Sequence, residues 1–356
     1  MKWNIQSFKC LPKIPILYTL ERTRAIVHAS PTEITQRITS YLRALSLGAI
    51  FDNERATALI HSADGTEFYV RLWQGNNDSP AKLGIVVEAQ KKRGCPLLFH
   101  RTARDVVRAA MGINMTMPKP SGVTTSCRRP LSLASIKRQQ QHLSNPTNKA
   151  RAREDMHFAL ESAGCLLKKD RVDANLLGID SLILLTDEES AGAEKAFCAA
   201  RALLSSEPSS EGIKERMVEL ILPKKRDEFD QIDADAIRCR ALTVLANSFY
   251  LLAREVGPNV CSILRDNAWH KETGFLSSLV EELDCAGKRP HSAYQATRCL
   301  NALMRTSIET SIEIKRKVVE LGGAYKIAKS QGVGHCCHAL LASECDAALE
   351  CLDSLK

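Results

Sequence analysis

The regular spacing of apolar residues stops between Gly112 and Ala150. This stretch contains four prolines and many Ser, Thr, Gln and Asn residues. A segment of that composition buries too little apolar surface to offset the entropy that it would lose on ordering. We therefore expect a disordered linker at 112–150, and we expect the rest of the 356-residue chain to fold as two separate parts.

Basic residues concentrate in and just before this linker. Between Lys91 and Arg153 the chain has fourteen Lys and Arg residues against one acidic residue, a net charge of +13, whereas the whole chain carries +8. Such a stretch attracts anionic partners such as acidic phospholipid headgroups or nucleic acid. No Phe, Tyr or Trp that could stack on bases lies between Gly112 and Arg153. Because this stacking platform is missing, we treat nucleic-acid binding through the basic linker as the alternative and lipid binding as the first expectation.

Residues 1–30 show no clear period, and we expect an arm with one short strand near 25–28. The apolar run from Ile14 to Leu20 is interrupted by Pro15 and is far shorter than the ~20 residues that cross a bilayer. Arg22 and Arg24 leave an organelle-targeting segment open as an alternative. The thirteen Cys residues are scattered mostly singly and without the spacing of a disulfide framework, which favours a reducing compartment. We expect a cytoplasmic protein, with the nucleus and the membrane periphery as alternatives.

The part from 31 to 111 mixes helical and strand periods. Ile34, Ile38 and Leu42 follow a proline at helical spacing, which predicts a helix that ends near Gly48. The alternating run 68–73 and the Asp-Gly dipeptide before it predict a hairpin with the strand at 56–61. A third strand at 83–90, a short fourth strand at 97–99 and a closing helix at 102–111 complete a compact α+β domain.

The strings SYLRALSLGAIF, TEFYVRLWQG and LGIVVEAQKKRGCPLLFHRTARDVVRA lie within this part, and it resembles the kinase-associated C-terminal domain of Ser/Thr protein kinases. The resemblance implies binding of acidic phospholipids through surface basic residues. Those residues would be Lys91, Lys92, Arg93, Arg101, Arg104 and Arg108. The chain has no Gly-rich loop, no His-Arg-Asp and no Asp-Phe-Gly motif, so the family's autoinhibitory role does not carry over.

Residues 151–356 are Ala-rich and predict helices throughout, with no strand pattern. The expected helices span 153–167, 171–185, 191–204, 212–222, 235–254, 260–267, 273–285, 291–306, 309–321 and 333–352. Similar short motifs begin late in four of them, at Ile179, Leu245, Leu300 and Leu349. Their intervals exceed the ~40–47 residues of armadillo and HEAT units, which insertions in the loops would explain.

The string RKVVELGGAYKIAKS, with a helix end, a double glycine and a new helix, resembles a junction between armadillo helices. The resemblance covers 151–356 and implies a right-handed solenoid whose concave groove binds extended peptides, often through a ladder of Asn residues. Asn247 stands at the matching place in one repeat. Ser181, Ala302 and Cys351 stand at the other three, so the resemblance supports a protein-binding groove more than an Asn ladder.

Other motifs have ordinary explanations. His335 and His338 are the only pair in the His-Cys-Cys-His run that could share one ion on a helix, and no second ligand pair accompanies them. The acidic cluster that begins at Asp230 lacks the ligands of a calcium loop and is expected to cap the helix from Asp235. Ser132 stands in an Arg-x-x-Ser spacing and is a phosphorylation candidate.

These observations predict an α+β domain followed by an armadillo-like or HEAT-like helical repeat domain. We expect a non-catalytic adaptor or scaffold that binds a protein partner in its groove, with tethering to acidic phospholipids by its basic region. We expect no cofactor and no metal. No catalytic motif stands in the chain, so an enzyme with an unrecognised site is the remaining alternative.

Overall fold

The structure is a computed structural model of the 356-residue chain. It describes residues 3–5, 7, 10–75, 84–113, 146–205, 210–222, 228–254, 263, 274–305 and 308–354. These form two compact units: Met1–Arg129 with Lys288–Pro290 and Gln331–Ser343, and the remaining segments, which make a helical unit. Most of the predicted linker lies outside the described residues, although its last residues belong to a helix. No helix in the described ranges is long and apolar enough to cross a membrane.

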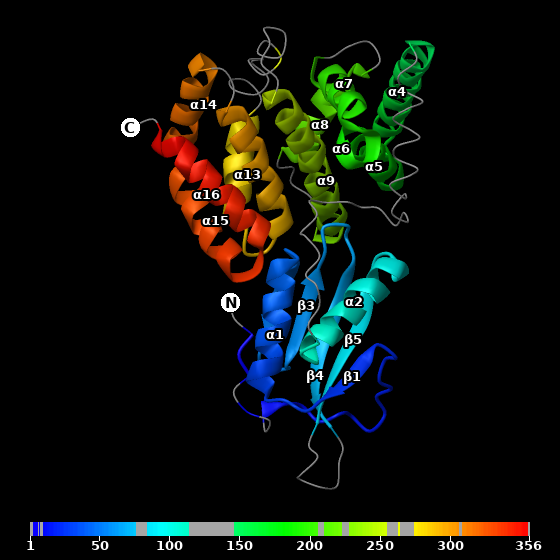
Figure 1. The fold of residues 1–356 in the computed structure, drawn as a ribbon, viewed down its shortest axis with the longest axis vertical. Coiled ribbons are helices and arrows are strands. Elements are labelled where there is room, and N and C mark those ends of the chain that lie inside the picture. The colour runs from blue at the N-terminus through cyan, green and yellow to red at the C-terminus, as the bar shows by residue number, and fades with distance from the viewer. Residues whose placement is uncertain are drawn as a thin grey trace. The chain divides into compact units, whose positions relative to one another are not determined.

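The first unit is built on a five-stranded antiparallel sheet in the order β1-β5-β4-β3-β2. Helices α1 and α2 cover one face of this sheet (Figure 1). The elements are β1 (Arg24–Val27), α1 (Pro31–Ala44), β2 (Gly48–Asp52), β3 (Thr57–His61), β4 (Glu67–Gln74), β5 (Ile85–Arg93) and α2 (Pro96–Ala110).

Helix α1 begins where the sequence predicts it. The hydroxyl of Ser30 accepts a hydrogen bond from the Glu33 backbone N–H at 3.2 Å, which satisfies one of the free donors of the first turn. Ile34, Ile38 and Leu42 on the inner side of the helix are almost completely buried. Each such side chain contributes about 1.5–3 kcal/mol by leaving water, so this face fixes α1 against the sheet.

Two sequence predictions are wrong at the ends of this unit. Residues 97–99 were expected to form a strand but belong to the first turns of α2, because Pro96 suits a first-turn position and the apolar residues that follow continue at helical spacing. Residues 48–52 form β2, which the sequence analysis missed because the segment is short and directly follows the end of α1. The predicted hairpin of β3 and β4 is confirmed.

The second face of the sheet carries many polar side chains. Antiparallel pairing places residues of neighbouring strands in rows across this face. One row contains His61, Glu67 and Arg93, and another contains Thr57, Arg71 and Glu88. A bulge in β5 next to the first row adds Lys92 to it. The bulge therefore gathers the positive charges of this strand end at one carboxylate.

The second unit is helical at every described position that has regular structure. Its helices are α4 (Pro146–Leu167), α5 (Val172–Thr186), α6 (Glu188–Ala191), α7 (Ala193–Ser205), α8 (Ile213–Ile221), α9 (Glu228–Ala253), α12 (Phe275–Asp284), α13 (Pro290–Met304), α14 (Ile308–Glu320), α15 (Gly323–Cys337) and α16 (Ala339–Asp353). Leu245 and Leu300 are fully buried, as their place in the apolar pattern predicts. The coarse prediction of an α+β part followed by a helical part is confirmed.

Three helix boundaries differ from prediction. Helix α9 begins at Glu228, so the acidic cluster near Asp230 lies within the helix and is not a capping loop. The linker prediction ends too late, because α4 begins at Pro146. The predicted helix 333–352 is divided at His338, whose ring Nδ1 accepts from the Leu341 backbone N–H at 3.1 Å. The imidazole thus takes the role of an N-cap side chain and starts α16. The predicted helix 260–267 lies outside the described residues apart from Ile263.

Candidate functional site

Two ion pairs link the α5–α6 segment to α9 and the residue that follows it. The Arg240 Nε donates to the Asp180 carboxylate at 2.9 Å. Just beyond the ends of both helices, Arg254 Nη1, one residue after α9, lies 2.9 Å from each oxygen of Glu188, the first residue of α6. Because residue numbers rise together in the two pairs, α5 and α9 run in the same direction.

Helices α13 and α16 are joined in a similar way. The Asn301 Nδ2 donates to the backbone oxygen of Glu344 at 2.8 Å and to its side-chain Oε2 at 2.7 Å. Near the ends of the same helices, the Cys351 thiol lies 3.7 Å from the Met304 carbonyl oxygen. The residue numbers again rise together, so α13 and α16 are also parallel.

Arg298 connects the two pairs of helices. From α13 its Nη1 donates to Asn247 Oδ1 on α9 at 3.1 Å and to Gln295 Oε1 at 2.9 Å. Its guanidinium also lies 5.9 Å from the ring centre of Tyr250 and 5.7 Å from that of Tyr294. None of these contacts is a carboxylate, so the positive charge of Arg298 is not neutralised by a described ion pair.

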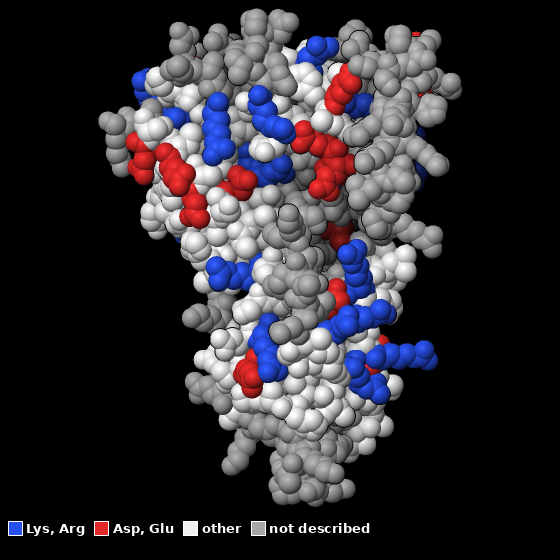
Figure 2. Space-filling view, in the orientation of Figure 1, with Lys and Arg blue, Asp and Glu red and all other residues white. Residues whose placement is uncertain are grey.

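Helical spacing places these groups on one surface. Arg240, Asn247 and Arg254 follow one another at seven-residue intervals, which is close to two helical turns. Helix α13 is buried except at His291 and Arg298. We call this set of side chains the polar stripe, and its members are Asp180, Glu188, Arg240, Asn247, Tyr250, Arg254, Tyr294, Gln295, Arg298, Asn301 and Glu344. Figure 2 shows basic side chains in the middle of the helical unit's visible face and acidic ones on both sides.

Two polar atoms of α13 lack a partner in this arrangement. Gln295 Nε2, a donor, and Asn301 Oδ1, an acceptor, are buried and make no hydrogen bond. Gln295 is 1% exposed and Asn301 is 5% exposed. Buried amide groups normally find partners, and an extended peptide backbone offers both a carbonyl and an N–H. The polar stripe therefore has the chemistry to bind a main chain and, at Arg298, an acidic side chain.

The helical unit also has an open hollow of about 580 Å³ between the end of α4 and the start of α8. Lys168, Lys169 and Arg216 line it together with the acidic residues Asp170, Glu211, Glu215 and Glu219. Arg216 is already paired with Glu219 at 2.7 Å. The charges within the hollow largely balance one another, so this site has less electrostatic selectivity than the polar stripe.

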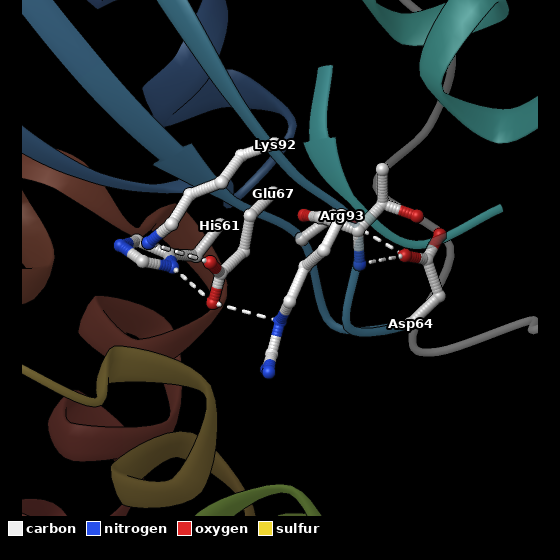
Figure 3. Close-up of polar contacts among 7 residues, drawn as sticks. His61, Asp64, Glu67, Lys92 and Arg93 are labelled. Carbon is white, nitrogen blue, oxygen red and sulfur yellow. Dashed lines mark hydrogen bonds and ion pairs between the residues drawn. The ribbon is translucent and has the colours of Figure 1, made fainter. Parts of the chain in front are cut away.

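The six predicted anion-binding residues lie on two elements, three on β5 and three on α2. Lys92 Nζ and Arg93 Nε lie 3.2 and 3.3 Å from opposite oxygens of Glu67, and His61 Nδ1 lies 3.3 Å from the second of these oxygens (Figure 3). Lys91 is exposed and reaches the Gly94 carbonyl at 3.4 Å. Glu67 therefore offsets part of the charge that the sequence assigns to this strand end.

The charge states of this cluster follow from burial and from neighbouring charges. Burial alone would raise the pKa of Glu67, but Lys92, Arg93 and His61 outweigh it, and the pKa of this carboxyl is lowered. Burial lowers the pKa of His61, and Glu67 opposes that shift only in part. The neighbouring turn is fixed by Asp64 Oδ1, which accepts from the Ser62 hydroxyl at 2.6 Å and the Thr66 backbone N–H at 2.7 Å.

The remaining three predicted residues lie on helix α2. Arg101, Arg104 and Arg108 are exposed, at spacings of three and four residues that place them along one helix side. In the described part of the chain none of them forms an ion pair. Leu97, on the first turn of the same helix, is 72% exposed. This side of α2 therefore keeps three available positive charges next to an apolar side chain.

The other predicted sites divide simply. Asn247 lies in the polar stripe, whereas Ser132 lies outside the described residues. The described residues contain no group of three or more His, Cys, Asp and Glu side chains placed to hold a metal ion. The sequence analysis missed Arg298 and Asn301, the second of which stands one position before the expected ladder place at Ala302. The spacing of Asn247, Arg298 and Asn301 in the sequence gave no signal, because only the helix packing brings these residues together.

Comparison with known proteins identified no relative: no family model, no curated protein and no solved structure matches this chain. The function must therefore be argued from the geometry of the two units alone.

Proposed function

We propose that the protein is a non-catalytic adaptor whose helical unit binds an extended acidic segment of a partner protein along the polar stripe. The observation that carries this proposal is Arg298, a cation that lies near two tyrosine rings and donates to two side-chain amides, with no carboxylate among its described contacts. We further propose that helices α5, α9, α13 and α16 are the peptide-binding layer of an armadillo-like solenoid. Their parallel pairs and their sequence order support that arrangement.

In the proposed mode of binding, the side-chain amides and the arginine have different roles. Asn247, Gln295 and Asn301 would exchange hydrogen bonds with the peptide backbone, which gives affinity without sequence selectivity. Arg298 would select an acidic side chain through a charge-assisted hydrogen bond, which contributes roughly 1.5–3 kcal/mol. The partner class is thus an extended segment with Asp or Glu at one defined position.

A peptide array tests this proposal. Short unstructured peptides of acidic, neutral and basic composition are immobilised and probed with the purified full chain. We expect acidic peptides to bind most tightly, and we expect Arg298→Ala to remove that preference with a loss of roughly 10- to 100-fold on acidic peptides only. Asn301→Ala should weaken all bound peptides alike. The matched control is Tyr325→Ala, an exposed site on α15.

Two results would contradict the proposal. If Arg298→Ala leaves the order of peptide affinities unchanged, Arg298 does not select acidic peptides. If Tyr325→Ala weakens binding as much as the stripe variants do, the interaction surface lies elsewhere on the helices. Thermal melting of each variant separates these results from simple unfolding.

A second candidate function is attachment of the sheet unit to an anionic membrane, which the three unpaired arginines of α2 favour. The sheet of this unit, with two helices on one face, is compatible with the proposed likeness to the kinase-associated lipid-binding fold. Each basic residue near such a surface contributes on the order of 1 kcal/mol, so the combined Arg101→Ala, Arg104→Ala and Arg108→Ala variant should bind phosphatidylserine vesicles more weakly at low salt. Tighter binding of the wild type to RNA than to vesicles at matched salt would favour nucleic acid instead.

A further inference from the structure

Ile16 and Leu17 project from the sheet unit without any cover. They form the tip of a turn that is closed by a hydrogen bond from the Tyr18 backbone N–H to the Pro15 carbonyl at 3.0 Å. Their exposed fractions are 101% and 97%, the highest among the large apolar side chains in the described ranges. Single half-exposed apolar residues are ordinary on a protein surface. Two adjacent apolar side chains that are fully in water contribute no burial to the fold, and exposed apolar groups of this kind often mark a binding site.

The base of this turn is held firmly against the open sheet face. Tyr18 donates its hydroxyl to Glu88 Oε2 at 3.0 Å, and the Glu21 backbone N–H donates to Glu88 Oε1 at 2.6 Å. Trp73 Nε1 also donates to Glu88 Oε2, at 2.8 Å, and the rings of Tyr18 and Trp73 lie 5.3 Å apart. Glu88 itself is fully buried. The turn is therefore a fixed projection whose tip points away from its anchors.

Basic residues flank the turn along the chain. Lys13, Arg22 and Arg24 are exposed, and Glu21 is the only acidic residue among the first thirty. Lys13 stands three residues before Ile16, which limits their separation to about 10–11 Å. Strand β1, which contains Arg24, packs against α2 with its three unpaired arginines. Figure 2 shows Lys and Arg side chains along this edge of the sheet unit.

We propose that Ile16 and Leu17 insert into the interfacial layer of an anionic lipid bilayer. A bilayer accepts a small apolar projection without needing a matching shape, and the surrounding cations would meet the headgroups at the same time. A protein pocket would in addition need a shape complementary to the tip. This inference rests on the membrane part of the proposed function and adds to it a site that the basic residues alone do not supply.

The test combines vesicle co-sedimentation with insertion into a phosphatidylserine-containing lipid monolayer. The full chain is compared with the double variant Ile16→Ser and Leu17→Ser, with the triple arginine variant of α2, and with Phe158→Ser, a 72%-exposed control in the helical unit. We expect the double variant to lose roughly tenfold or more in vesicle affinity at physiological salt and to stop penetrating compressed monolayers. Its residual binding should depend more steeply on salt, because only charge attraction remains.

The outcomes separate the two ideas. If the double variant binds and penetrates like the wild type while the arginine variant is impaired, the insertion site is wrong and the electrostatic attachment stands. If the wild type fails to bind phosphatidylserine vesicles at low salt, both are wrong. Because both side chains are fully exposed, the double variant should melt at the wild-type temperature. If it melts lower and also loses binding, Leu17→Lys provides a second test, because a lysine suits an exposed position but does not insert into the bilayer. Monolayer penetration by Leu17→Lys equal to that of the wild type would contradict the insertion site.

Discussion

Glu88 is a carboxylate without solvent contact whose two oxygens accept from three donors. Tyr18, Glu21 and Trp73 supply these donors, and Arg71 approaches through its own hydrogen bond to the Tyr18 hydroxyl at 2.9 Å. A buried charge is tolerated only when such bonds replace its hydration. Glu88 therefore helps to attach the segment before β1 to the sheet, together with the Gln74 backbone N–H, which donates to the Pro12 carbonyl at 2.9 Å.

Glu88→Ala should leave three donors without an acceptor. We expect a loss of about 3–5 kcal/mol in the free energy of unfolding, because removing one member of a buried charged network costs that amount. Urea unfolding followed by Trp fluorescence measures it. Glu54→Ala, at an exposed position in the turn before β3, is the control and should change little. A loss below about 1 kcal/mol would mean that the network contributes no more than a surface contact.

The Glu67 cluster predicts a pH dependence of stability. Folding lowers the pKa of Glu67, so its contribution is complete above the unfolded value and is lost as the pH falls through the folded value. Folding also lowers the pKa of His61, so protonating it at acid pH costs further stability. Both effects act in the same direction, and stability should fall as the pH drops from neutral to about 4.

An NMR titration of the His61 ring checks this directly. Its pKa should lie below the usual value of about 6.5, and Glu67→Gln should lower it further by removing the charge that partly offsets burial. A rise in the His61 pKa in that variant would show that Glu67 is not its main partner.

At the scale of elements, boundaries depend on interactions that the sequence does not reveal. The division between α15 and α16 comes from the ring of His338, a residue rarely expected at a helix start, so the periodicity of 333–352 predicted one helix. The same limit applies to α2, where the Leu97–Phe99 run has the composition of a strand and the position of a helix start. Periodicity identified the buried faces of α1, β4 and α9 well, because burial repeats along an element whereas a cap occurs once.

His338→Ala should destabilise the start of α16. The lost cap costs about 0.5–2 kcal/mol, and the buried ring leaves a cavity in addition. His338→Asn keeps a capping acceptor and should recover part of the loss. Differential scanning calorimetry of the wild type and the two variants gives the order of their melting temperatures. Equal melting temperatures of the Ala and Asn variants would contradict a capping role.

At the scale of the whole molecule, the sequence predicted the division into an α+β part and a helical part. The composition of 112–150 interrupts the apolar pattern, and that interruption is visible without any knowledge of packing. The polar stripe could not be predicted, because Asn247 and Arg298 are fifty-one positions apart. Their meeting depends on which helices become neighbours, and the spacing of residues within one helix does not specify this. The positions of the basic residues are read from the sequence, but the pairing of Lys92 and Arg93 with Glu67 depends on the strand register.

The integrity of the helical unit should depend on its two fully buried leucines. Leu245→Asp or Leu300→Asp would bury an unpaired carboxylate, and we expect a loss above 4 kcal/mol and a large decrease in helical circular dichroism. Tyr250→Asp on the exposed side of α9 is the matched control and should leave the helical signal unchanged. Unaltered melting of both leucine variants would mean that the unit tolerates opening at its centre.

The hydrogen bond between Tyr18 and Glu88 spans 70 residues of chain, and this separation sets an order of events during synthesis. Chains leave the ribosome from the N-terminus, at about 5–20 residues per second, so residues 13–21 emerge several seconds before their acceptor. Until β5 has been synthesised, the turn has no hydrogen-bond acceptor to attach to, and its two apolar side chains are not held in a fixed position. The projection at Ile16 and Leu17 is thus completed only together with the sheet, and a nascent chain that stalls before Glu88 cannot display it.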